Sequence, residues 1–80
     1  MKILITGAAG QIGSGLSKLL IENGHDLTLV DNLRNGYLEN LKDDANEVIA
    51  PFYEVDITSG EFFLKCGDQY DVIIHLAAIT

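Results

Sequence analysis

Three glycines spaced three residues apart near the start of the chain constrain its fold more than any other feature. Gly7, Gly10 and Gly13 stand between an apolar run over 3–5 and a segment of helical periodicity. A short run of branched apolar residues is typical of a strand that is covered on both faces, as in a parallel sheet. The glycines therefore indicate a tight turn that leads from a buried strand over 2–6 into a helix.

Hydrophobic periodicity predicts that this helix runs over 11–23. Its apolar residues recur at intervals that put them on one helical face: Ile12, Leu16, Leu19, Leu20 and Ile21. Gly24 is suited to follow the helix, because glycine adopts the left-handed conformation at no steric cost. Gly15, one turn into the helix, is interpreted as a packing contact and not as a ligand.

The rest of the chain continues the alternation of strands and helices. Further strands are predicted over 27–31, 52–56 and 71–76, with helices over 37–45 and 58–64 between them. Parallel strands need crossover connections, and a helix is the usual one. The order βαβαβαβ therefore predicts an α/β fold with a Rossmann-type parallel sheet in strand order 3-2-1-4, the first half of a doubly wound dinucleotide-binding domain.

The pattern Gly-x-x-Gly-x-x-Gly over 7–13 also has a chemical interpretation. Gly7 allows a sharp exit from the strand, Gly10 lets the backbone approach a pyrophosphate, and Gly13 lets the helix pack closely. The helix N-terminus offers unpaired N–H groups and roughly half a positive charge to the phosphates. The alternative is a glycine-rich turn that binds nothing, but its place between a strand and a helix favours a dinucleotide site.

A carboxylate at the end of the second predicted strand bears on the choice of cofactor. Asp31 follows Gly13 by 18 positions, where a carboxylate can accept hydrogen bonds from the adenosine ribose. Two like charges roughly 4 Å apart cost about 4 kcal/mol at an effective dielectric near ~20, so Asp31 disfavours a 2′-phosphate and favours NAD over NADP. Arg34 complicates this choice, since an arginine can serve a 2′-phosphate, but we interpret it as a surface residue. The alternative for Asp31 is a solvated carboxylate at a strand end.

Four motifs occur in order along the whole chain. They read Thr6-Gly7-Ala8-Ala9-Gly10-Gln11-Ile12-Gly13, Val30-Asp31-Asn32-Leu33, Asp56-Ile57 and His75-Leu76-Ala77-Ala78. Together they resemble the extended short-chain dehydrogenase/reductases. Within that family the chain is most similar to NAD-dependent sugar-nucleotide epimerases and dehydratases, especially the UDP-glucose 4-epimerase type, through Asp31-Asn32-Leu33-Arg34-Asn35-Gly36.

The resemblance implies a role for each residue that matches a family motif. Five residues would cradle the pyrophosphate of NAD: Gly7, Gly10, Gln11, Ile12 and Gly13. One residue would hold the adenosine ribose, and three would line the same end: Asp31, then Asn32, Asn35 and Gly36. Two would meet the adenine edge and three would form the floor beneath the nicotinamide half: Asp56 and Ile57, then Leu76, Ala77 and Ala78. The alternatives are that Asp56 caps the turn at Thr58 and that the two alanines serve packing.

The family's catalytic Tyr-x-x-x-Lys pair is absent from this sequence. Tyr37, Tyr53 and Tyr70 are each followed four residues later by an aliphatic side chain. The resemblance therefore implies that residues 1–80 form the N-terminal part of an NAD(P)-binding Rossmann domain, without catalytic residues or the substrate-binding part. Such a chain would be the NAD-binding portion of an epimerase or dehydratase, inactive by itself, and a nucleotide sugar would bind only to a full-length protein. The alternative is a non-catalytic module that binds or senses a dinucleotide.

Composition bears on partners and location. Five basic residues against twelve acidic ones give a net charge of −7, which disfavours nucleic acid as a partner. No apolar run exceeds four residues, so no membrane span is expected. His25, His75 and Cys66 have no metal-ligand spacing, and a single cysteine favours the reducing cytoplasm.

The fourth predicted strand, over 71–76, bears on association. In the order 3-2-1-4 it lies at the edge of the sheet with one side unpaired. An unpaired apolar edge recruits other strands. We therefore expect the isolated chain to self-associate, to pair with a complementing half or to remain partly unfolded.

Overall fold

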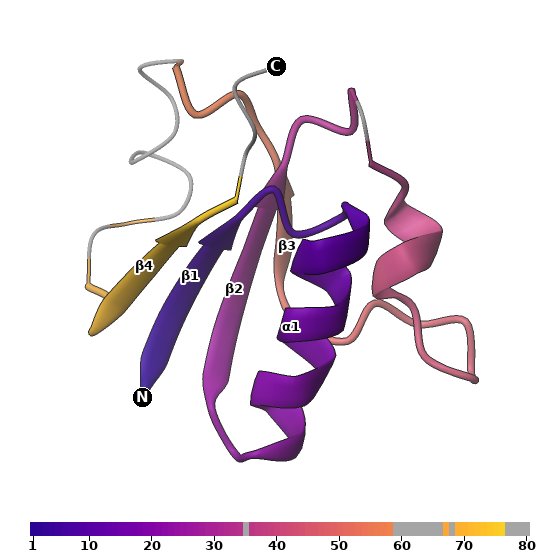
Figure 1. Ribbon diagram of the computed structural model, residues 1–80, viewed down its shortest axis with the longest axis horizontal. Helices are drawn as coiled ribbons and strands as arrows, with labels where there is room; N and C mark the ends of the chain where they lie inside the picture. The colour runs from indigo at the N-terminus through magenta and orange to yellow at the C-terminus, as the bar shows by residue number, and fades with distance from the viewer. Residues whose placement is uncertain (35, 59–66, 68, 77–80) are drawn as a thin grey trace.

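The structure, a computed structural model, contains a twisted parallel sheet with one long helix against it (Figure 1). It describes residues 1–34, 36–58, 67 and 69–76. Four strands form the sheet: β1 (Lys2–Thr6), β2 (Asp26–Asp31), β3 (Phe52–Glu54) and β4 (Val72–His75). Their order is β3-β2-β1-β4, and every pairing is parallel. The predicted α/β class and the order 3-2-1-4 are therefore confirmed.

Side chains that alternate along the central strands fill a core on each face of the sheet. Ile3 and Ile5 pack on one face together with Leu27 and Leu29 of β2. Leu4 packs on the other face, in a cluster with Val30 and Val55. This alternation confirms that the apolar run over 3–5 is a strand covered on both faces.

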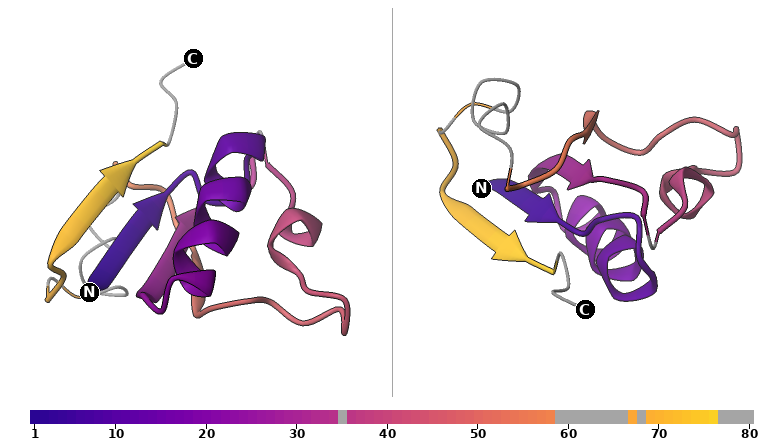
Figure 2. Two further views of the ribbon diagram at one scale, coloured as in Figure 1. Left: turned by 60° about the horizontal axis from the view of Figure 1, so that its bottom comes forward. Right: turned by 90° about the horizontal axis from the view of Figure 1, so that it is seen from above.

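Helix α1 (Gln11–Glu22) covers β1 and β2 on one face, as the two views of Figure 2 show. It ends as predicted: Asn23 is its C-cap, and Gly24 follows with a φ of 85°. The predicted apolar face of the helix coincides only in part with the side that faces the sheet. Small residues are buried there, namely Gly13, Ser14 and Ser17.

The apolar stripe of α1 is only partly covered. Leu20 and Ile21 pack against the core, whereas Ile12 is 76% and Leu19 is 55% exposed. Ser17 lies against the sheet without an unsatisfied hydroxyl, because its Oγ donates a hydrogen bond to the Gly13 carbonyl at 2.6 Å. The interpretation of Gly15 as a packing contact is wrong, since a Cβ placed there would meet nothing within 4 Å.

The connection from β2 to β3 differs from the predicted helix over 37–45. Only a 3-10 turn forms, η1 (Leu38–Leu41). The cause is Asp43, whose Oδ1 accepts hydrogen bonds from the backbone N–H groups of Ala45 at 2.9 Å and Glu47 at 3.0 Å. These local bonds compete with helical ones, and the chain turns back at Asn46, which has a φ of 64°.

Two other expectations have different outcomes. The third strand is shorter than predicted and ends at Glu54, although the Val55 N–H still donates to the Asp31 carbonyl at 3.2 Å. The predicted helix over 58–64 lies outside the described residues beyond Thr58. Within the part of the chain that the structure describes, no helix is both long and apolar enough to cross a membrane.

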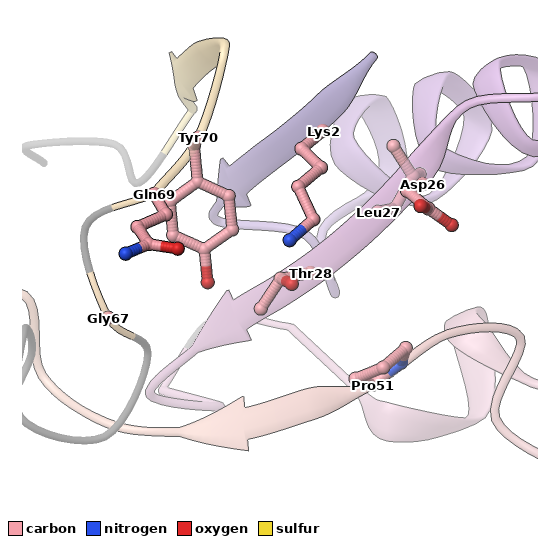
Figure 3. A pocket seen from close by; sticks show the side chains of 8 residues that line it. All are labelled: Lys2, Asp26, Leu27, Thr28, Pro51, Gly67, Gln69 and Tyr70. Carbon is pink, nitrogen blue, oxygen red and sulfur yellow. The ribbon is translucent and has the colours of Figure 1, made fainter.

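A pocket of about 450 Å³ lies at the amino-terminal ends of β1 and β2 (Figure 3). Its lining comes from the strand starts and the segment before β4: Lys2, Asp26, Leu27, Thr28, Pro51, Gly67, Gln69 and Tyr70. Tyr70 also packs against the Leu4 and Val30 cluster, on the face away from α1. Because the pocket lies at the starts of the strands and the glycine turn follows the end of β1, the two are at opposite ends of the sheet.

Candidate functional site

The carboxyl ends of the parallel strands bring the predicted site residues to one edge of the sheet. The glycine turn follows β1, Asp31 ends β2, and Leu76 follows β4 (Figure 1). In open α/β sheets, ligands bind at this edge. The sheet topology alone thus gathers residues that are far apart in the sequence.

The turn between β1 and α1 requires glycine at two positions for reasons that the structure makes visible. Gly7 has a φ of 70°, a conformation that other residues rarely adopt. A Cβ on Gly13 would lie 2.9 Å from the Cα of Ala8 and would also overlap the Gly7 carbonyl. The sharp exit at Gly7 and the close packing at Gly13 are confirmed.

The start of α1 is suited to hold an anion. Its first backbone hydrogen bond runs from the Ser14 N–H to the Gly10 carbonyl at 2.9 Å, so the N–H groups of Gln11, Ile12 and Gly13 precede the helical ladder. The first turn contains no acidic residue. A Cβ on Gly10 would meet only the Gly7 carbonyl, at 3.6 Å, so this position is not filled by the protein itself. The turn therefore fits a phosphate group.

Asp31 is a buried carboxylate, only 8% exposed. Its Oδ2 accepts a hydrogen bond from the Ala9 N–H at 2.9 Å, and its Oδ1 accepts one from the Leu33 N–H at 2.7 Å. The alternative of a solvated strand-end aspartate is therefore wrong. Each oxygen has two lone pairs, so both retain capacity for a further donor. Asp31 thus joins the end of β2 to the glycine turn.

The loop after Asp31 is built from local turns. The Arg34 N–H donates a hydrogen bond to Oδ1 of Asn32 at 2.9 Å. Arg34 is exposed, which confirms its interpretation as a surface residue. Asn35 lies outside the described residues.

The segment around η1 contacts the glycine turn directly. Nδ2 of Asn40 donates a hydrogen bond to the Ala9 carbonyl at 2.7 Å, and the Tyr37 N–H donates to the same oxygen at 3.2 Å. A Cβ on Gly36 would lie 2.7 Å from the Ala9 carbonyl carbon, so Gly36 is needed for close approach. Asn40 could not be predicted from the sequence, because its partner is 31 residues away and no local pattern marks it.

Asp56 follows β3 and is exposed. Its Oδ1 accepts hydrogen bonds from the Thr58 N–H at 2.9 Å and from Thr58 Oγ1 at 2.7 Å. The backbone bond is the main cause of a lowered pKa for this carboxyl, followed by the hydroxyl bond and the charge of Arg34. The alternative that Asp56 caps the Thr58 turn is confirmed. Ile57 packs against the Leu4 and Val30 cluster.

The fourth strand is tied to the first beside the turn. Thr6 Oγ1 and His75 Nδ1 share a hydrogen bond of 2.9 Å, and the Leu76 N–H donates to the Thr6 carbonyl at 3.0 Å. His75 is a strand residue, as expected. Ala77 and Ala78 lie outside the described residues, which contain no group of His, Cys, Asp or Glu side chains suited to a metal ion.

The sequence and structure have counterparts among known proteins. The model of the NAD dependent epimerase/dehydratase family matches residues 3–80. A UDP-N-acetyl-alpha-D-glucosaminuronate decarboxylase from Bacillus cytotoxicus is 36% identical over 78 residues, which cover 98% of this chain and 24% of the relative.

Solved structures of epimerases are also similar to this chain. A UDP-glucose 4-epimerase from Thermotoga maritima, crystallised with UDP-glucose, is 41% identical with a TM-score of 0.80, and the match covers 100% of this chain and 25% of that one. A UDP-glucose 4-epimerase from Thermus thermophilus in complex with NAD is 31% identical with a TM-score of 0.79, and covers 98% and 24%.

These relatives are much longer than the chain, which spans about a quarter of their length. The similarity nevertheless extends over nearly all of the 80 residues, including the glycine turn and Asp31. The chain belongs to the NAD dependent epimerase/dehydratase family.

Proposed function

We propose that the chain is the N-terminal, NAD-binding part of an epimerase or dehydratase that acts on a nucleotide sugar. The observation that carries the proposal is the glycine turn over 7–13, which Asp31 holds through the Ala9 N–H at the carboxyl edge of the sheet. NAD in the Thermus thermophilus epimerase and UDP-glucose in the Thermotoga maritima enzyme support the cofactor and the substrate class.

Each part of the edge would bind a different part of NAD. The turn would hold the pyrophosphate through the first turn of α1: Gly7, Gly10, Gln11, Ile12 and Gly13. The end of β2 would bind the adenosine ribose: Asp31, with Asn32, Asn35 and Gly36. The ends of β3 and β4 would meet the adenine edge and the nicotinamide half: Asp56 and Ile57, then Leu76, Ala77 and Ala78. Bound NAD accepts and returns a hydride, and the residues of this chain bind and orient it.

The 80-residue chain is expected to convert no nucleotide sugar, because it contains no Tyr-x-x-x-Lys pair to act as general base. The test incubates it with NAD and UDP-glucose and follows the sugar by chromatography, beside the longest protein encoded in the same reading frame. NAD binding is measured by calorimetry on both. Turnover by the chain alone would contradict this prediction. If the longest protein binds NAD but converts no sugar, the non-catalytic module is favoured. If the longest protein binds no NAD, the proposed function is overturned.

Asp31 is expected to set a preference for NAD over NADP. Asp31→Asn removes the charge that opposes a 2′-phosphate, and even a third of about 4 kcal/mol corresponds to roughly a tenfold change in the ratio of the NADPH and NADH dissociation constants. The ratio of dissociation constants is the useful readout, because a loosened turn would weaken the binding of NADH and NADPH equally and leave the ratio unchanged. Asp26→Asn is the matched control, because Asp26 stands exposed at the other end of β2. An unchanged ratio for Asp31→Asn would rule out this role.

A further inference from the structure

Ala9 in the glycine turn is fully buried, and groups outside the turn bind both of its backbone polar atoms. Its N–H donates to Asp31 Oδ2 at 2.9 Å. Its carbonyl accepts from Asn40 Nδ2 at 2.7 Å and from the Tyr37 N–H at 3.2 Å. The shorter of the two bonds to the carbonyl is the one from a side chain.

The packing around Ala9 leaves no room for the η1 segment to move toward the turn. Gly36 already approaches so closely that a Cβ would lie 2.7 Å from the Ala9 carbonyl carbon. Leu41, the residue after Asn40, is fully buried in the same core as Ala9. The position of Asn40 is therefore fixed on the core side by its neighbour, and its amide is aimed at the turn.

The orientation of the Ala9 carbonyl determines that of the next backbone groups. The Ala9 oxygen and the Gly10 N–H belong to one planar trans peptide, so a donor that holds the oxygen also fixes the N–H. That N–H donates to the Gly7 carbonyl at 3.3 Å, and the Gly10 carbonyl accepts the first bond of α1 from Ser14 at 2.9 Å. Asn40 thus acts on the peptide from which the helix N-terminus begins.

We propose that Asn40 is a positioning residue of the dinucleotide site, which orients the N–H groups at the start of α1 toward a pyrophosphate without touching it. The inference rests on the proposed function. An asparagine suits this position because its amide donates to a carbonyl. Aspartate, of nearly the same shape, would place a negative oxygen against the carbonyl and would add a charge close to the phosphates.

The test compares Asn40→Ala and Asn40→Asp in the longest protein that carries this sequence. Loss of one hydrogen bond is expected to weaken NAD binding about three- to tenfold in Asn40→Ala, and more in Asn40→Asp. Adenosine has no phosphate and would not contact the pyrophosphate turn. Its affinity is therefore expected to change by less than about twofold in both variants. Amide hydrogen exchange at residues 9–13 is expected to accelerate in both variants.

Asn23→Ala is the matched control, because Nδ2 of Asn23 donates to the Leu19 carbonyl at 2.8 Å at the far end of α1. It removes a bond of the same kind and is expected to leave NAD affinity and exchange at 9–13 unchanged. Unchanged NAD affinity in Asn40→Ala, or an equal loss for NAD and adenosine, would overturn the inference. If amide exchange accelerates in the Asn40 variants but the unsubstituted protein binds no NAD, the proposed function fails. Asn40 would then order the turn without serving a dinucleotide site.

Discussion

Replacing Gly13 by alanine is expected to destabilise the protein by roughly 1–3 kcal/mol or more and to weaken NAD binding with it. The added Cβ would lie 2.9 Å from the Ala8 Cα and would overlap the Gly7 carbonyl. Both neighbours are backbone, so the helix must move away from the strand. Urea denaturation followed by circular dichroism measures the stability, and calorimetry measures the affinity for NAD.

Gly15→Ala is the control within the same helix. A Cβ at Gly15 meets nothing within 4 Å, and alanine is the better helix former, so this variant is expected to gain about 0.5–1 kcal/mol. A loss of stability in Gly13→Ala and a gain in Gly15→Ala would show that the effect comes from close packing at the turn and not from glycine replacement in general. Equal effects at the two positions would contradict the role given to Gly13.

The isolated 80-residue chain is expected not to persist as a stable monomer. In the described part of the chain β4 pairs only with β1, and Val72 is 36% and Ile73 is 44% exposed on it. Full burial of such a side chain contributes roughly 1.5–3 kcal/mol, which is a large share of the ~5–15 kcal/mol that stabilises an ordinary domain. Sedimentation at low micromolar concentration, together with a thermal melt, measures the outcome.

Ile73→Lys provides a direct test of the edge. A lysine on an edge strand opposes pairing with another strand, so this variant is expected to sediment as a smaller species than the unsubstituted chain. Lys18→Ala, on the exposed surface of α1, is the control and is expected to leave association unchanged. A monodisperse species of 8.7 kDa that melts cooperatively above about 60 °C would contradict the expectation for the unsubstituted chain.

The sheet was predictable because its signals are local. The apolar run over 3–5 and the glycines after it determine a strand, a turn and a helix within a dozen residues, and the crossover rule then orders the strands. The helix predicted over 37–45 failed for an equally local reason that hydrophobic spacing does not register. Asp43 binds the backbone ahead of it and turns the chain back before a second helical turn can form.

The site was predictable in its residues but not in its connections. Glycine spacing and the interval to Asp31 mark the edge, yet neither shows that the Asp31 carboxylate is buried and bound to Ala9. Asn40 carries no signal at all, because its bond to the turn depends on how two distant segments pack. The apolar stripe predicted the buried side of α1 only in part, because close approach at Gly13 selects small residues at the start of the helix.

The double attachment of Asp31 has a consequence for redesign of cofactor specificity. Asp31 accepts hydrogen bonds from the N–H groups of Ala9 and Leu33, and it is also proposed to bind the ribose. A substitution that changes one of these roles therefore changes the other. Removing its charge to admit a 2′-phosphate also removes an acceptor that the turn needs. A stepwise route to NADP would therefore begin elsewhere, with a new acceptor for the Ala9 N–H, and would replace the aspartate only afterwards.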